Sequence, residues 1–197
     1  MKTLTRAKLQ ISKNKVLKYL GVRGEVAPEL DSLLDECFAI AEPYMGGKAV
    51  FEVYDITFNG EILNLGFAKV KSKDLLKNLQ GCNKIALFAA TVGAGFDRLI
   101  LKYGKISPSK ATVFQAIGSA TVEALCDAVN EEIINIYGSC KPRYSCGYGD
   151  LNISLQRDIF AALSLQNNLA ITLSENFFMT PTKSVTAIVG IKNCAEK

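Results

Sequence analysis

Histidine and tryptophan are both missing from this chain of 197 residues, and the missing histidine excludes the most chemistry. Without an imidazole the chain cannot perform Ser-His-Asp hydrolysis or Cys-His proteolysis. It also cannot build a two-histidine zinc helix, or ligate haem or corrinoid cobalt through histidine. Every mechanism that needs an imidazole is therefore excluded.

The chain also lacks a strong charge of either sign and a long apolar run. It carries 23 Lys and Arg against 19 Asp and Glu, a net charge of +4 that is too mild to indicate a nucleic-acid partner. The longest uncharged stretch, residues 159–174, contains Gln and Asn and is not typical of a membrane span. The first residues have no apolar signal-peptide core, so we expect a cytoplasmic location.

Six cysteines are spread along the chain, and no two of them have CxxC spacing. We therefore expect reduced thiols that act as small core residues, and no metal site. The length and the 49% hydrophobic content predict one domain over residues 1–197. Residues 1–83 would carry N-terminal helices and a β-hairpin, and residues 84–197 the functional motifs.

Hydrophobic periodicity and turn residues predict an α+β fold with a twisted mixed or antiparallel sheet and flanking helices. Asn59-Gly60 between two β-prone runs predicts a hairpin, and Ser107-Pro108 predicts the start of a helix that Gly138 ends. The other predicted helices cover residues 12–20, 28–44, 72–80 and a segment around 155–163. Strands are predicted at residues 5–11, 48–58, 61–67, 84–90, 170–173, 177–179 and 185–191.

A glycine-containing turn, Gly93-Ala94-Gly95, joins a predicted buried strand to a helix, a context that favours an anion or nucleotide. However, Arg98 stands where a dinucleotide fingerprint would have its third glycine. The later strand with its ribose-binding acid is also missing. A tight structural turn is the better interpretation, and a self-sufficient methyltransferase with a doubly wound sheet is the less favoured alternative.

A second candidate is the aperiodic stretch of residues 139–150, because long loops in compact domains are often functional. Arg143 can hold a carboxylate in a bidentate fork, and the glycines let the backbone approach a ligand. Alternatively, Arg143 caps the end of the preceding helix, and composition favours the two interpretations about equally. Cys140 and Cys146 could form a redox pair, but free thiols are preferred. Glu123, among apolar neighbours, lies on the solvent face or is buried with a partner.

Val122-Glu123-Ala124-Leu125, Arg143-Tyr144-Ser145-Cys146-Gly147-Tyr148 and the segment of residues 174–187 follow one another along the chain. In this order the three segments resemble motifs of the activation (reactivation) domain of cobalamin-dependent methionine synthase. Residues 143–148 have the R-x-x-x-G-Y pattern, and residues 122–125 resemble A-E-A-F. Residues 174–187 resemble T-E-S-x-x-M-x-P-x-x-S-V-S-G. The match covers roughly residues 84–192, and the form of residues 147–151 is similar to the stand-alone branch, in which this domain is a separate short protein.

The resemblance implies S-adenosylmethionine as the ligand. Arg143 would contact its carboxylate, the backbone of Tyr144, Ser145, Cys146 and Gly147 would hold the nucleoside and tail, and Glu123 would help to place the ligand. Tyr148 would lie near the transferred methyl group and the corrin. Val189 and Gly190 stand where the full-length synthases have an aromatic pair that touches the ligand, and Asp55 is the candidate for an N-terminal ligand-contacting aspartate.

The resemblance also implies a function in methionine biosynthesis, as a component of a methyltransferase rather than a complete enzyme. The chain would support reductive methylation of cobalamin on a cobalamin-binding methionine synthase, acting in trans, with a flavodoxin-like protein as one possible electron donor. Because the chain has no histidine, the cobalamin must be carried by the partner. The alternatives are an activator of another corrinoid methyltransferase and a non-catalytic S-adenosylmethionine-binding or interaction protein.

Overall fold

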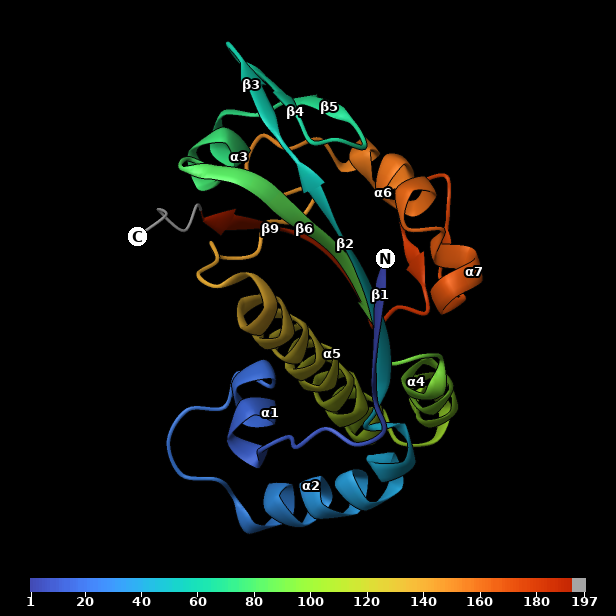
Figure 1. The fold of residues 1–197 in the computed structure, drawn as a ribbon. Helices are drawn as coiled ribbons and strands as arrows, with labels where there is room; N and C mark the ends of the chain where they lie inside the picture. Colours follow the sequence, from blue (N-terminus) through green and yellow to red (C-terminus); the bar gives the residue numbers. More distant parts are fainter. Residues whose placement is uncertain (193–197) are drawn as a thin grey trace.

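A four-stranded antiparallel sheet forms the centre of the computed structural model, which describes residues 1–192 (Figure 1). The strand order is β1-β2-β6-β9, and every neighbouring pair in it is antiparallel. The sheet twists strongly along its length in Figure 1. This confirms the predicted α+β class with a twisted antiparallel sheet. The strands are β1 (Lys2–Arg6), β2 (Gly47–Asp55), β6 (Cys82–Thr91) and β9 (Ser184–Lys192).

The 30-residue helix α5 crosses one face of the sheet together with three shorter helices, and the remaining elements cover the opposite face (Figure 1). The first group is α1 (Lys13–Tyr19), α2 (Pro28–Ala41), α4 (Gly95–Ile106) and α5 (Pro108–Tyr137). The second group contains the helices α3 (Lys73–Asn78), α6 (Gln156–Ala162) and α7 (Leu165–Leu169). It also contains two small antiparallel sheets. One is formed by β3 (Thr57–Asn59), β4 (Ile62–Asn64) and β5 (Lys69–Lys71), and the other by β7 (Thr172–Leu173) and β8 (Met179–Thr180). Short 3-10 helices occupy Glu42–Tyr44 and Ile153–Leu155.

Two hydrophobic cores lie on the two faces of the sheet, and alternate residues of β6 belong to each. Phe88 packs into the core under α5, whereas Leu87 packs into the core under α3, α6 and α7. Because both faces are covered, β6 is apolar at nearly every position rather than at every second one. This explains the continuous apolar run from which a buried strand was predicted.

Local capping signals in the sequence give the observed helix ends. The hydroxyl groups of Ser12 and Ser72 accept the backbone N–H groups of Lys15 and Leu75 at 3.3 and 3.0 Å. Gly138, with φ +83°, ends α5. α5 begins as predicted, with Ser107 at the N-cap position and Pro108 in the first turn, although the Ser107 hydroxyl makes no capping hydrogen bond.

The first strand and the hairpin differ from the prediction in detail. The strand predicted at residues 5–11 is β1, which ends at Arg6, because an exposed edge strand has almost no apolar alternation by which to place it. The hairpin at Asn59-Gly60 is confirmed, since Asn59 pairs with Ile62, but it belongs to a separate small sheet.

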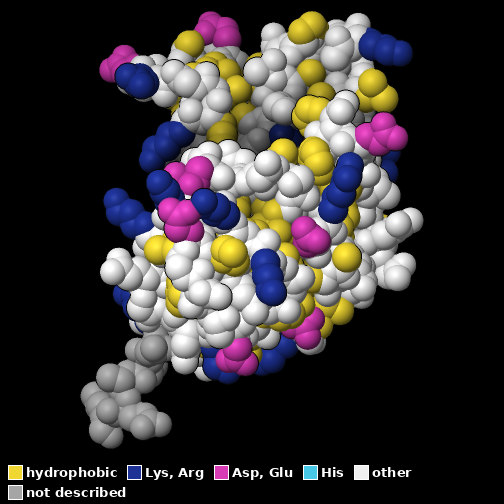
Figure 2. Space-filling view, turned by 90° about the horizontal axis from the view of Figure 1, so that it is seen from above, with side chains coloured by type: hydrophobic (Ala, Val, Ile, Leu, Met, Phe, Trp, Pro, Cys, Tyr) yellow, Lys and Arg dark blue, Asp and Glu magenta, His cyan; other side chains and the backbone are white. Residues whose placement is uncertain are grey.

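The five cysteines among the described residues are free thiols, and four of them are buried. This confirms the prediction for those five, while Cys194 lies outside the described residues. Within residues 1–192, no helix is both long and apolar enough to cross a bilayer. On the face seen in Figure 2, Lys and Arg side chains lie among Asp and Glu side chains rather than in one continuous patch.

Candidate functional site

The loop after α5 runs along the outer edge of β9, where it behaves as an irregular fifth strand. Tyr144 exchanges two backbone hydrogen bonds with Ile188, at 2.9 and 2.8 Å. Lys141 donates its N–H to the carbonyl of Gly190 at 2.7 Å. The loop therefore covers an edge that would otherwise expose unpaired backbone groups, and the sheet fixes the backbone on both sides of Arg143.

The side chain of Arg143 points to the middle of α5 because neighbouring residues of an extended segment face opposite sides. Tyr144 packs against the core on the α6 side, so Arg143 faces the α5 side. There its Nη2 donates to Oε2 of Glu123 at 2.9 Å and lies 3.2 Å from Oδ1 of Asp127. The structure thus brings Arg143 and Glu123 together, and Arg143 reaches these carboxylates rather than the last carbonyls of the helix.

The guanidinium of Arg143 has acidic partners at Nη2 but no hydrogen-bond partner at Nη1. Its side chain is 24% exposed, yet its Nη1 atom is buried and donates to no acceptor within residues 1–192. A buried donor without a partner costs free energy, commonly about 1–3 kcal/mol and more for a charged group. An acceptor supplied from outside the protein would remove that cost, and a carboxylate matches the fork geometry of arginine.

The remaining predicted ligand residues, 144–148, follow directly along the same loop. Ser145 donates its hydroxyl to the carbonyl of Thr186 at 2.8 Å, and Gly147, with φ +87°, turns the chain away from the sheet. Cys146 is buried, and burial raises the pKa of its thiol to about 12, so this thiol is not a nucleophile near neutral pH. Tyr148 is 59% exposed and projects from the loop, with its ring centroid 6.0 Å from that of Tyr144.

The far end of the loop is fastened to α3 by a contact that the sequence analysis did not identify. The carboxylate of Asp150 accepts the hydroxyl of Ser72 and the backbone N–H of Lys73, the latter at 2.7 Å. These two hydrogen bonds hold the pKa of Asp150 below its usual value. A Cβ at Gly149 would collide with the Asp74 carboxylate, which shows how closely the loop approaches α3.

A cavity of about 500 Å³ on the α1 side is connected to the Arg143 ion pairs through Lys15. Lys15 lines the cavity, and its Nζ lies 3.3 Å from Oδ2 of Asp127, which also pairs with Arg143. Tyr19, one turn after Lys15, lines the same cavity. Burial, and next the negative charges of Glu123 and Asp127, raise the pKa of Tyr19. The sequence analysis missed Lys15 and Tyr19, and a Lys-Tyr pair at i, i+4 is too common to have identified them.

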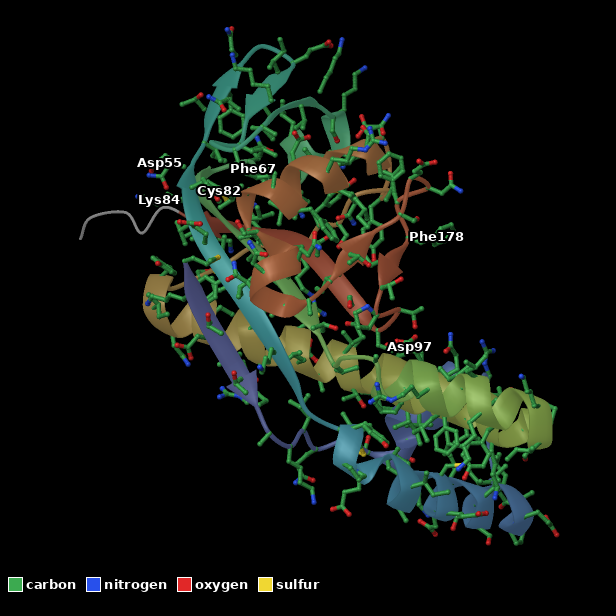
Figure 3. The ribbon with its side chains drawn as sticks, turned by 90° about the vertical axis from the view of Figure 1, so that its right-hand side faces the viewer. Asp55, Phe67, Cys82, Lys84, Asp97 and Phe178 are labelled. Carbon is green, nitrogen blue, oxygen red and sulfur yellow. The ribbon has the colours of Figure 1, made fainter. Side chains whose placement is uncertain are left out.

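The structure does not bring every suggested residue to this cluster. Val189 is 1% exposed and packs in the core under α5, and a Cβ at Gly190 would meet Leu79 and Cys82. Both therefore face the protein interior. Asp55 ends β2 and pairs with Lys84 at 3.0 Å on the surface (Figure 3).

The turn at Gly93-Ala94-Gly95 joins β6 to α4, away from the loop at the β9 edge. The doubly wound alternative based on this turn was wrong, because every strand pair within residues 1–192 is antiparallel.

Comparison with known proteins agrees with this architecture at the level of the fold. No family model and no curated protein matches the sequence. Among solved structures, the crystal structure of the MetH reactivation domain bound to AdoHcy superposes with a TM-score of 0.70 and 13% sequence identity. The match covers 100% of this chain and 80% of the other. The protein therefore has the fold of the MetH reactivation domain.

Proposed function

We propose that this protein binds S-adenosylmethionine at Arg143 and acts as an activation module, in trans, for a cobalamin-dependent methionine synthase. One observation carries the proposal: a guanidinium with a buried, unpartnered nitrogen stands beside a carboxylate in the fold of a domain that binds AdoHcy. AdoHcy is the product left when S-adenosylmethionine has given up its methyl group. A site that holds one presents the groups needed for the other.

The residues of the cluster match the charged groups of S-adenosylmethionine. Arg143, whose side chain is 24% exposed, would receive the ligand carboxylate, while its Nη2 stays on Glu123. Glu123, 36% exposed, can accept the ligand ammonium from the solvent side. The neighbouring cavity at Lys15 and Tyr19, which is lined by residues of α1 and its start, has the volume of several hundred Å³ that is typical of small-molecule sites.

The backbone of the loop divides into a part used by the fold and a part left for a ligand. The backbone N–H and carbonyl of Tyr144 both form hydrogen bonds with Ile188. The N–H of Cys146 faces its own thiol, whereas the N–H of Ser145 donates to no acceptor within residues 1–192, so Ser145 supplies the loop donor that remains for the nucleoside or the amino-acid tail. This narrows the expected backbone contacts within residues 144–147.

For methyl transfer, this chain would position the ligand and exclude water. Bound S-adenosylmethionine supplies an activated methyl group, and a reduced corrinoid on the partner protein supplies the nucleophile, with the electron coming from a flavodoxin-like donor. Neither requires a base from this chain, which fits the absence of histidine. Tyr148, exposed at the tip of the loop, would lie between the ligand and the docked corrin.

Isothermal titration calorimetry with S-adenosylmethionine tests the binding step. Arg143→Gln should weaken binding by about 1.5–3 kcal/mol, the usual contribution of a charged hydrogen bond. Lys141→Gln removes one positive charge from the same loop and should leave the affinity unchanged. Equal affinities of Arg143→Gln and the wild type would remove Arg143 from the ligand site.

A transfer assay tests the remainder of the proposal. The protein is mixed with inactivated, cobalamin-loaded methionine synthase, a reductant and methyl-labelled S-adenosylmethionine, and label on the corrinoid is measured. Tyr148→Ala should lower transfer while S-adenosylmethionine still binds. Binding without any transfer would support a non-catalytic binding protein, and transfer only to a different corrinoid protein would identify another methyltransferase as the partner.

A further inference from the structure

A second cavity, of about 420 Å³, lies where β1 ends, β2 begins and β6 turns into α4. It shares no lining residue with the cavity at Lys15 and Tyr19. In Figure 1 this region is at the lower end of the sheet, next to the start of α4. The turn of residues 91–95, which the proposed function does not use, forms one wall.

Three cationic residues from three different elements line this cavity. Arg6 ends β1, Lys48 is the second residue of β2, and Arg98 lies in the first turn of α4. No Asp or Glu lines the cavity, and none of the three cations forms an ion pair within residues 1–192. A cavity whose lining includes cationic residues and no acidic one favours an anion from outside the chain.

The nearest acidic residue in sequence is committed elsewhere. Asp97 precedes Arg98, but its carboxylate accepts the backbone N–H of Thr182 at 3.2 and 3.3 Å and also the Thr182 hydroxyl. Figure 3 shows Asp97 at the start of α4. The Asp97 carboxylate therefore holds the segment before β9, and it forms no ion pair with Arg98 within residues 1–192.

Glycines keep part of the cavity wall free of side chains. A Cβ at Gly47 would lie only 2.6 Å from the carbonyl oxygen of Thr91, so β2 and β6 approach too closely there for any larger residue. Gly93, with φ +73°, has open space where a Cβ would stand. The backbone at Gly93 is therefore open to a ligand, whereas Gly47 only lets β2 and β6 pack closely.

We propose that this cavity binds a small molecule bearing a phosphate group. A phosphate carries close to two negative charges and three acceptor oxygens, which suits two guanidinium groups and an ammonium group. The volume falls in the range of small-molecule pockets. An extended polyanion such as RNA is less well matched, because the net charge of the chain is only +4.

The test is calorimetric titration with inorganic pyrophosphate in a buffer free of phosphate and sulfate, with sodium chloride added to match ionic strength. The wild type should bind, and Arg98→Gln should weaken binding about 10- to 100-fold, as expected for one charged hydrogen-bonding partner. Lys105→Gln removes the same charge from the same helix outside the cavity, and should change the affinity by less than about twofold.

Absence of pyrophosphate binding would overturn the proposal, and so would equal weakening by Arg98→Gln and Lys105→Gln. Arg6→Gln provides a second test from another element, with circular dichroism to establish that each variant folds. An RNA oligonucleotide that binds far more tightly than pyrophosphate, with the same dependence on Arg98, would replace the small molecule by a nucleic acid.

The outcome of the pyrophosphate titration does not depend on whether the protein binds S-adenosylmethionine. Arg98→Gln should leave S-adenosylmethionine binding unchanged, and Arg143→Gln should leave pyrophosphate binding unchanged. If only one titration fails, only the corresponding site is refuted. Amide chemical shifts of Gly93 and Gly95 should move with pyrophosphate and not with S-adenosylmethionine, which locates the bound anion within the protein.

Discussion

Replacing each of the two acidic partners of Arg143 by alanine should have clearly different effects on stability. Glu123 and Asp127 are one helical turn apart on α5, and both lie within ion-pair distance of Nη2 of Arg143. Only Glu123 meets hydrogen-bond geometry, at 2.9 Å, and it is 36% exposed against 52% for Asp127. Comparing the two substitutions therefore compares the stability contributed by a half-buried hydrogen-bonded ion pair with that of a more solvent-exposed ion pair.

The expected magnitudes follow from that geometry. A hydrogen bond between charged groups contributes about 1.5–3 kcal/mol, and exposed ion pairs contribute about 0–1 kcal/mol. Because the Arg143–Glu123 contact is partly exposed, Glu123→Ala should lower the free energy of unfolding by about 1–2 kcal/mol. Asp127→Ala should change it by less than about 0.5 kcal/mol, since alanine also favours the helix.

Urea unfolding at neutral pH and low salt measures both effects, and a double-mutant cycle with Arg143→Ala isolates each pair. The cycle should give a coupling energy of about 1 kcal/mol for Glu123 and close to zero for Asp127. A coupling energy for Asp127 equal to or larger than that for Glu123 would refute the assignment of Glu123 as the residue that holds Arg143.

Three further predictions follow from packing, capping and burial. Gly118→Ala should destabilise the protein by about 1–2 kcal/mol in urea unfolding, because a Cβ there would stand 2.9 Å from the Phe96 ring. Gly104→Ala, with open space around it, should stabilise α4 by about 0.5–1 kcal/mol, and equal signs for the two variants would contradict this explanation. The pKa of Asp150 is lowered from its usual value of 3.8 in the folded protein. The stability that this carboxylate contributes is therefore complete above pH 3.8 and is lost as the pH falls through the lower folded-state pKa. Below about pH 4, the free energy of unfolding of the wild type should therefore depend more steeply on pH than that of Asp150→Asn. Peptide mapping after iodoacetamide treatment at pH 8 should find Cys140 modified well before Cys126 and Cys146, because burial raises the pKa of these two thiols to about 12. Similar modification rates for the three thiols would show that the loop or the core opens readily.

The elements that were predicted correctly have signals within a few residues of themselves. Ser12 and Ser72 mark helix starts, Gly138 marks the end of α5, and β6 is a continuous apolar run because helices cover both faces of the sheet. β1 has no such signal, since it is an exposed edge strand. Its place is decided by the backbone of β2 rather than by its own side chains.

The site was predictable only in part, because its contacts are long-range. The ion pair of Arg143 with Glu123 spans 20 residues, and their shared site was expected only through a family resemblance. Lys15 reaches Asp127 across 112 residues, and Ser72 reaches Asp150 across 78. No periodicity in the sequence encodes such contacts, since they depend on how α1 and α3 pack against the rest of the fold.

The attachment of the loop to β9 argues that Arg143 is placed before any ligand arrives. Four backbone hydrogen bonds join Ser139, Lys141 and Tyr144 to β9, and a fifth bond comes from the hydroxyl of Ser145. At about 0.5–1.5 kcal/mol each, breaking all five would cost about 2.5–7.5 kcal/mol, besides uncovering the edge of β9. A loop held this firmly does not open as a lid. A ligand that meets Arg143 therefore finds its guanidinium already oriented, and binding loses little free energy to ordering the loop.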